Sequence, residues 1–98
     1  MINMPCGGGS QFDEQDLIAH IRASGRDYIV TGGRKCTLAN HQKPHSLDFW
    51  LRHQTHRQDT LQTCQEVIGE LVATGLFVEE RGLNCPDSGH ACKGIRLA

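Results

Sequence analysis

Two groups of cysteine and histidine residues carry side chains that bind metal ions: Cys85, His90 and Cys92 in one segment, and Cys36, His41 and His45 in an earlier one. Structural zinc is held by a tetrahedron of such ligands, usually with one pair separated by about two to four residues. Neither group contains a Cys-x-x-Cys pair, so the spacing matches no zinc finger or ribbon. A single zinc or iron site is conceivable if the two segments fold together, with these ligands: Cys85, Cys92, His90 and Cys36.

The same cysteines have two simpler interpretations, a cross-strand disulfide or ordinary loop thiols. The chain has five cysteines, an odd number, and no apolar segment resembling a secretory signal near Met1. A disulfide scaffold is therefore not expected. Cys64 falls on the apolar stripe of a predicted helix and is expected in the core, and Cys6 has no expected role.

Catalytic chemistry has weaker support in the sequence. The run Gly32-Gly33-Arg34-Lys35-Cys36-Thr37 superficially resembles a phosphate-binding loop, but it lacks the Gly-Lys-Ser/Thr order and the helix that should follow. The pair His53-x-x-His56 is more typical of a solvated turn than of a metal site. No nucleophile and base occur in a recognisable frame, so we do not expect an enzyme.

The charge of the chain is unevenly distributed, although its formal net value is only −1. Residues 34–57 contain five lysines and arginines against one acidic residue, and also four of the six histidines. A polyanion such as nucleic acid is therefore expected to bind at this basic segment.

The length of 98 residues suits one domain, which we place at residues 10–98 after a flexible leader at residues 1–9. No apolar run approaches the roughly 18 residues needed to span a bilayer, so we expect no membrane contact and a cytoplasmic location. A core this small gains from burying more apolar surface, which favours a homodimer.

Hydrophobic spacing in the first half predicts a helix over residues 12–24, capped by Ser10 with Asp13 three residues on, and then a strand over residues 28–31. Gly32-Gly33 can form a two-residue hairpin turn with a partner strand at residues 34–38. The alternative for residues 27–38 is one short strand followed by a loop. The expected aromatic core residues are Phe12, Tyr28, Phe49, Trp50 and Phe77.

In the second half, Ser46 is expected to cap a short helix over residues 47–53. A longer amphipathic helix begins after a cap at Asp59 or Thr60 and ends near Gly75, with this apolar stripe: Leu61, Cys64, Val67, Ile68, Leu71 and Val72. A strand follows over residues 76–80. Residues 94–98 alternate apolar and polar side chains, which predicts a returning strand.

The run from residue 60 to residue 78 resembles the recognition-helix half of the winged helix-turn-helix superfamily, through these residues: Thr60, Cys64, Ile68, Leu71, Gly75 and Leu76. This resemblance implies an α+β, winged-helix-like fold of three helices with a C-terminal two-stranded wing, to which the 27–38 hairpin would be an addition. A distant likeness to small iron-transport regulators of the FeoC type is confined to the cysteine-bearing wing between Cys85 and Cys92.

The resemblance implies a small DNA-binding regulator or accessory protein that contacts duplex DNA through these residues: Arg52, Arg57, Gln58, Gln62, Thr63, Gln65, Arg81 and Lys93. The long helix itself carries Glu66 and Glu70 and no lysine or arginine, and carboxylates near phosphates oppose binding. The alternative is a protein-interaction or dimerisation module whose acidic helix meets a basic partner, with a structural metal on the wing cysteines as an option.

Overall fold

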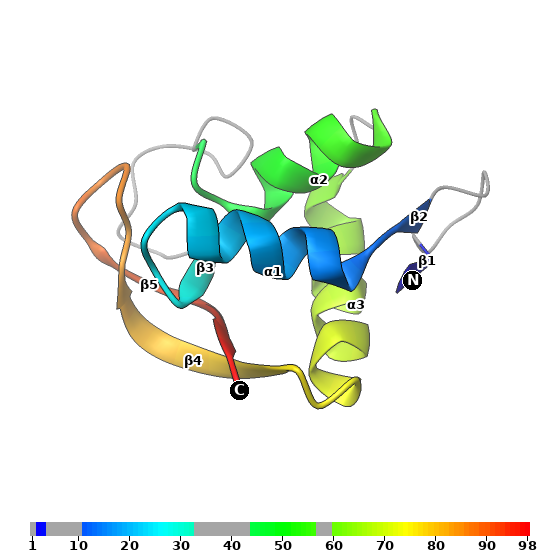
Figure 1. Ribbon diagram of the computed structural model, residues 1–98. Helices are drawn as coiled ribbons and strands as arrows, with labels where there is room; N and C mark the ends of the chain where they lie inside the picture. Colours follow the sequence, from blue (N-terminus) through cyan, green and yellow to red (C-terminus); the bar gives the residue numbers. More distant parts are fainter. Residues whose placement is uncertain (1, 4–10, 33–43, 57–59) are drawn as a thin grey trace.

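The computed structural model describes residues 2–3, 11–32, 44–56 and 60–98, and shows a mixed α+β fold (Figure 1). Its elements in chain order are β1 (Ile2–Asn3), β2 (Gln11–Phe12), α1 (Glu14–Ala23), β3 (Tyr28–Gly32), α2 (Leu47–Thr55), α3 (Thr60–Ala73), β4 (Phe77–Asn84) and β5 (Ala91–Leu97). The predicted order of helix, strand, two helices and two returning strands is confirmed over these residues.

The last strand of the chain is the central strand of the main sheet. The antiparallel order is β3-β5-β4, and Ile95 of β5 lies between Ile29 of β3 and Glu79 of β4. The predicted return of residues 94–98 is therefore confirmed, and the strand begins three residues earlier, at Ala91. The hairpin partner predicted at residues 34–38 lies outside the described residues.

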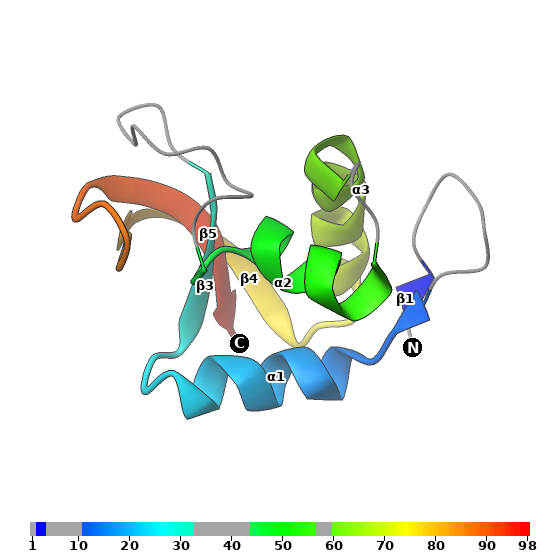
Figure 2. The same cartoon turned by 90° about the horizontal axis from the view of Figure 1, so that it is seen from above.

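The sheet bends sharply at Lys93, because both neighbouring strands have an extra residue opposite it. On β4 the pairing steps from Glu80–Gly94 to Leu83–Cys92, and on β3 it steps from Val30–Gly94 to Gly32–Lys93. Such bulges increase local twist. Figures 1 and 2 show that the β4–β5 hairpin curves strongly toward its tip.

Polar side chains serve as the N-caps of α1 and α2. The Ser46 hydroxyl accepts a hydrogen bond from the Phe49 N–H at 3.2 Å, which confirms its predicted role as the cap of α2. For α1 the N-cap is Asp13 and not the predicted Ser10, which lies outside the described residues; the Asp13 side chain accepts from the Gln15 N–H at 2.9 Å. Phe12, predicted inside this helix, lies instead in β2 because the cap at Asp13 ends the extended backbone.

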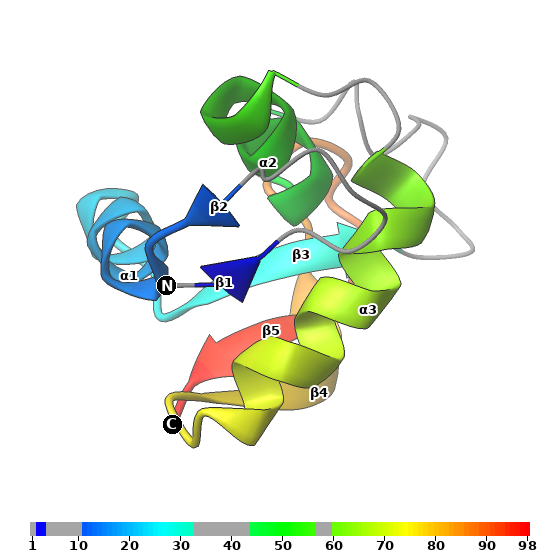
Figure 3. The same cartoon turned by 90° about the vertical axis from the view of Figure 1, so that its right-hand side faces the viewer.

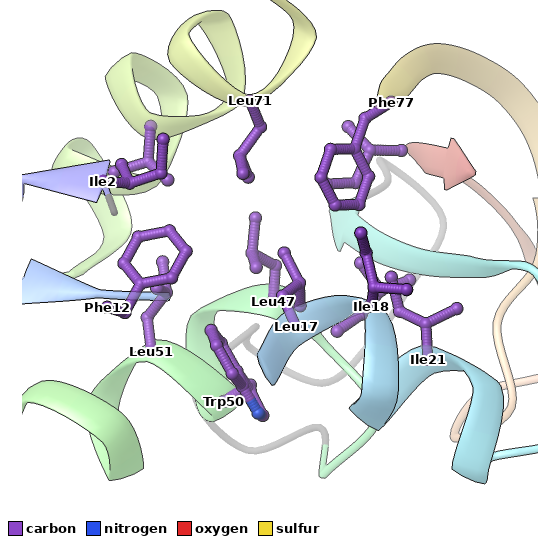
Figure 4. Packing of buried hydrophobic residues seen from close by; sticks show 13 residues of the cluster. Ile2, Phe12, Leu17, Ile18, Ile21, Leu47, Trp50, Leu51, Leu71 and Phe77 are labelled. Atoms are coloured by element: carbon purple, nitrogen blue, oxygen red, sulfur yellow. The ribbon is translucent and has the colours of Figure 1, made fainter. Parts of the chain in front are cut away.

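One hydrophobic core holds the helices against one face of the sheet (Figure 3). It contains Leu17 and Ile21 of α1, Leu47 and Leu51 of α2, and Leu71 of α3, with Leu17, Leu47, Leu51 and Leu71 fully buried (Figure 4). α3 carries the predicted apolar stripe through Val67 and Leu71, which have no exposed surface. The side chains of Leu61 and Cys64, also in the predicted stripe, lie outside the described part of the chain.

Three of the five predicted aromatic core residues are buried: Phe12, Trp50 and Phe77. The rings of Phe12 and Trp50 are nearly perpendicular, in a T-shaped contact with centroids 5.5 Å apart (Figure 4). The prediction was wrong for Phe49, which is only partly buried and stacks on His53 one helical turn later. Tyr28 is also only partly buried, because it lies on the sheet face opposite the helices.

Ile2 and Asn3 lie inside the segment assigned to a flexible leader, yet they form a strand. They pair with Phe12 and Gln11, and the Ile2 side chain joins the hydrophobic core with 7% of its surface exposed (Figure 4). These two residues are therefore held by the fold through apolar burial and backbone pairing.

Candidate functional site

Of the predicted DNA contacts on the helices, Gln65 is exposed on α3. Gln62 and Thr63 belong to the first turns of α3, but their side chains are not among those described. Arg57 and Gln58 precede α3 and also lie outside the described residues.

Arg52 is engaged within its own helix. Its Nε lies 3.3 Å from Oδ1 of Asp48, one turn earlier in α2, and the Asp48 side chain is only 1% exposed. A buried carboxylate without its cation is costly, so this ion pair favours a structural role for Arg52. The Asp48 carboxylate offsets the charge of Arg52, which makes Arg52 a weaker candidate for a phosphate contact.

Arg81 and Lys93 are both exposed on the β4–β5 hairpin, at the bulge described above. β4 starts at the end of α3 and runs away from it, so in Figures 1 and 2 the hairpin tip lies at the left and α3 lies right of centre. Arg81 and Lys93 are therefore brought near one another, while Gln65 belongs to a separate element.

The exposed side of α3 and the start of β4 are acidic. Glu66 and Glu70 are exposed on α3 one turn apart, and Glu79 is exposed on β4. Because side chains alternate along a strand, Glu79 shares with the buried Phe77 the sheet face on which the helices pack. Leu76, in the turn that joins α3 to β4, is 38% exposed. We call Glu66, Glu70, Leu76 and Glu79 the acidic surface.

A second arrangement joins the hairpin tip to the start of α2. Both oxygens of the Asp87 carboxylate meet His45: the His45 backbone N–H donates to Oδ2 at 3.1 Å, and Nδ1 lies 2.9 Å from Oδ1. The Asp87 side chain is 12% exposed and that of His45 is 47% exposed. This contact spans 42 residues of sequence.

His45 and Pro86 line a cleft of about 260 Å³, a volume that includes space open to solvent. The other walls come from the end of α1, including His20, from β3, including Tyr28, and from Arg26 between them. The pKa of His20 is lowered, first by burial, which disfavours the imidazolium, and then by the nearby charge of His45. A cleft this small is below the usual size of a ligand pocket.

The two hairpin cysteines pack as small core residues. Cys85 and Cys92 are thiols, 0% and 3% exposed, and form a second apolar cluster with Val30 on the sheet face opposite the helices. The cross-strand disulfide is therefore not formed. Burial among apolar atoms is typical of unreactive, structural cysteines.

The predicted metal ligands do not converge in the described part of the chain. His90 is exposed, while both hairpin thiols are buried. No group of three histidine, cysteine or acidic side chains that could hold a metal occurs among the described residues. Cys36 lies outside them, so a site that includes it stays a prediction.

Sequence reasoning missed His20, Asp87 and the role of His45 as their neighbour. No local signal connects them, because they come from α1, the hairpin tip and the residue before the α2 cap. His45 contacts Asp87 of the hairpin tip and lines the same cleft as His20.

Comparison of the chain with protein-family models, with curated proteins and with solved structures gave no match. Within the described ranges, the helices are too short or too polar to cross a bilayer.

Proposed function

We propose that the domain is of the winged-helix type. This proposal is supported by the order α1, β3, α2, α3, β4, β5, and by the antiparallel pairing of the strand after the first helix with the last strand. It is also supported by the packing of the three helices on one face of that sheet. Fold alone does not define function, so the functional proposal depends on the surface.

We infer that the module binds a basic protein partner through the acidic surface. The observation that carries this proposal is the charge of α3: the ionised side chains described on its exposed side, Glu66 and Glu70, are both acidic. Glu79 extends the negative field onto β4, and Leu76 offers an apolar contact within it. A basic segment carrying a large apolar residue complements both features.

The same surface disfavours the docking of α3 in the major groove. Carboxylates at the middle and end of a reading helix approach the phosphate backbones, and no cation described on this helix offsets them. Protein recognition therefore accounts for the charge of α3 better than DNA recognition does.

Duplex DNA remains a second candidate because Arg81 and Lys93 are both exposed on the hairpin. A hairpin that contacts phosphates positions a protein on DNA, and exposed Gln65 offers a donor and an acceptor toward bases. In this arrangement only the first turns of α3 would approach the duplex.

Charge reversal separates the two candidates. The probes are a lysine-rich amphipathic peptide and a mixed-sequence DNA duplex, each titrated into the full chain and followed by fluorescence anisotropy. Replacing Glu66 and Glu70 together by lysine should weaken peptide binding at least about tenfold, an effect of about 1.4 kcal/mol. The same variant should bind DNA more tightly than the native chain.

The matched control is Asp27→Lys, an exposed position whose backbone carbonyl, not its side chain, accepts from the Leu97 N–H. A specific surface predicts little change in peptide affinity for this variant. Asp27→Lys changes the net charge by two units and the α3 variant changes it by four, so equal losses of binding free energy per unit of charge would reduce the effect to net charge. Native DNA binding that decreases steeply with salt and is lost on Arg81→Ala would favour the second candidate instead.

A further inference from the structure

The outer edge of β4 is an open edge of the main sheet. In the order β3-β5-β4, this strand has β5 on one side and no strand of the described chain on the other. Figure 1 shows β4 along the lower margin of the sheet, with no other ribbon below it. The opposite edge is partly covered, because Val30 of β3 pairs with Ser46 in a parallel bridge. An open edge presents backbone groups to which a further strand can bond.

The register identifies which backbone groups of β4 point outward. The Ala98 N–H donates to the Leu76 carbonyl at 3.0 Å, in line with the pairing of β4 and β5. Hydrogen-bonded positions alternate along an antiparallel pair, so Val78 also bonds to β5. The N–H and C=O groups of Phe77 and Glu79 therefore point away from β5, and no backbone group elsewhere in the described chain bonds to them.

The central strand supports this assignment from its other side. The Leu97 N–H donates to the Asp27 carbonyl, just before β3, at 2.8 Å. Leu97 thus bonds toward β3 and Ala98 bonds toward β4, which is the alternation that a central antiparallel strand requires.

The side chains beside these open positions are apolar on one face and acidic on the other. Leu76 and Val78 are the large apolar side chains that the described chain leaves exposed, at 38% and 40%. Because side chains alternate along a strand, Val78 lies on the sheet face opposite the helices and Glu79 on the helix side. Glu79 is exposed without an ion-pair partner among the described residues, whereas the Glu80 carboxylate lies 3.3 Å from Arg96.

We propose that an extended basic segment of a partner protein binds along the outer edge of β4 as a fourth strand of the sheet. The added strand would bond to the outward backbone groups of Phe77 and Glu79. It would place an apolar side chain beside Val78 and a lysine or arginine beside Glu79. The edge thus selects a segment in which basic and apolar residues alternate. This inference rests on the proposed function, whose basic partner it describes as a strand.

The bulge in β4 limits the length of this pairing. The register with β5 shifts between Glu80 and Leu83, and Gly82 has a φ of 75°, so the regular part of the edge ends at Glu80. The exposed Arg81 follows that point. A second copy of the chain would bring the same acidic segment against Glu79 and Glu80, and like charges on facing strands are destabilising. A basic segment has the complementary charge.

The test compares two short labelled peptides of identical composition, titrated into the full chain and followed by fluorescence anisotropy. In the first, lysine and valine alternate, as an added strand requires. In the second, the same residues are reordered so that the valines fall at helical spacing. We expect the alternating peptide to bind at least about tenfold more tightly. Tighter binding of the helical isomer would overturn the added strand and leave the proposed function standing, whereas binding of neither peptide would overturn both.

Backbone methylation of the alternating peptide provides a control that needs no variant of the chain. A strand at a sheet edge bonds through alternate N–H groups, and its other N–H groups face away. Methylating the backbone nitrogens of the lysines and those of the valines should therefore have unequal effects. We expect one set to weaken binding by about tenfold and the other by less than about twofold. Equal effects of the two sets would refute a paired strand.

Two substitutions at Glu79 separate its backbone from its charge. Glu79→Pro removes the outward N–H, a change that an edge strand tolerates, whereas the matched Glu79→Gln removes the charge alone. We expect Glu79→Pro to weaken binding of the alternating peptide about tenfold more than Glu79→Gln does.

Hydrogen exchange of the native chain gives a readout that does not depend on how a variant folds. In the saturated complex with the alternating peptide, the Phe77 and Glu79 amides should gain protection. The Val78 amide, already bonded to β5, should change little. Phe77 and Glu79 amides that exchange as fast as in the free chain would contradict the added strand.

Discussion

Gly94 offers the sharpest test of how the sheet is assembled. A Cβ at this position of β5 would lie 2.4 Å from the Ile29 carbonyl oxygen, 2.9 Å from Leu83 Cδ1 and 3.1 Å from Val30 Cα. Two of these atoms belong to the backbone of β3, so the clash cannot be relieved by rotating a side chain. We expect Gly94→Ala to lower the free energy of unfolding by about 2–3 kcal/mol, the upper part of the range for overpacked cores.

Gly69 supplies a matched control on α3. It is exposed, and an added Cβ would have no neighbour within 4 Å outside the helix's own backbone. Gly69→Ala should therefore raise the free energy of unfolding by about 0.8–1 kcal/mol through helix propensity. In urea denaturation, with a slope of about 1.5–2 kcal/mol per molar, Gly94→Ala should lower the midpoint by about 1–2 M and Gly69→Ala should raise it by about 0.5 M. A Gly94→Ala variant as stable as the native chain would contradict the close approach of β3 and β5.

Three further changes test separate parts of the fold by the same urea assay. Leu71→Ala removes a fully buried side chain of α3 and should cost about 2–5 kcal/mol; a loss below about 1 kcal/mol would place α3 outside the core. Ser46→Ala removes the α2 cap and should cost about 1 kcal/mol, whereas no loss would mean that the cap contributes nothing. His56 ends α2 with a φ of 57°, so His56→Gly should stabilise the chain by about 1 kcal/mol; a destabilised variant would show that the His56 side chain has another contact. The predicted homodimer is checked by sedimentation equilibrium of the native chain.

Much of the fold could be predicted because its signals are local. The apolar spacing of Val67 and Leu71 marks α3, the hydroxyl of Ser46 marks the start of α2, and the alternation after Gly94 marks β5. Each of these features depends on residues within one element and its immediate neighbours. The partners of the last strand were not predictable in the same way, since pairing with both β3 and β4 depends on how the chain returns.

The surface was harder to predict, because its chemistry depends on contacts distant in sequence. The contact between Asp87 and His45 joins residues 42 positions apart, and it lies beyond the point where bulges on β3 and β4 coincide opposite Lys93. Two features of the surface could have been predicted from the sequence, and the first is an ion pair within α2. Asp48 and Arg52 are four residues apart, the spacing of a helical ion pair.

The acidity of the long helix was also visible in the sequence, through Glu66 and Glu70. The structure adds that both are exposed, and that Glu79 is exposed on β4, the strand that follows α3. This grouping shifts the balance from a DNA-reading helix toward a surface for a basic protein, because carboxylates approaching phosphates are repelled while ammonium and guanidinium groups are attracted.

Chemical-shift mapping tests this central claim most directly. The ¹⁵N-labelled native chain is titrated with the lysine-rich amphipathic peptide at constant pH and salt, and every backbone amide is followed. We expect the largest changes to cluster at Glu66, Glu70, Leu76 and Glu79, while the amide chemical shifts of residues 85–91 in the hairpin stay unchanged. Changes centred on the hairpin, or none at all at concentrations that saturate a micromolar site, would contradict it.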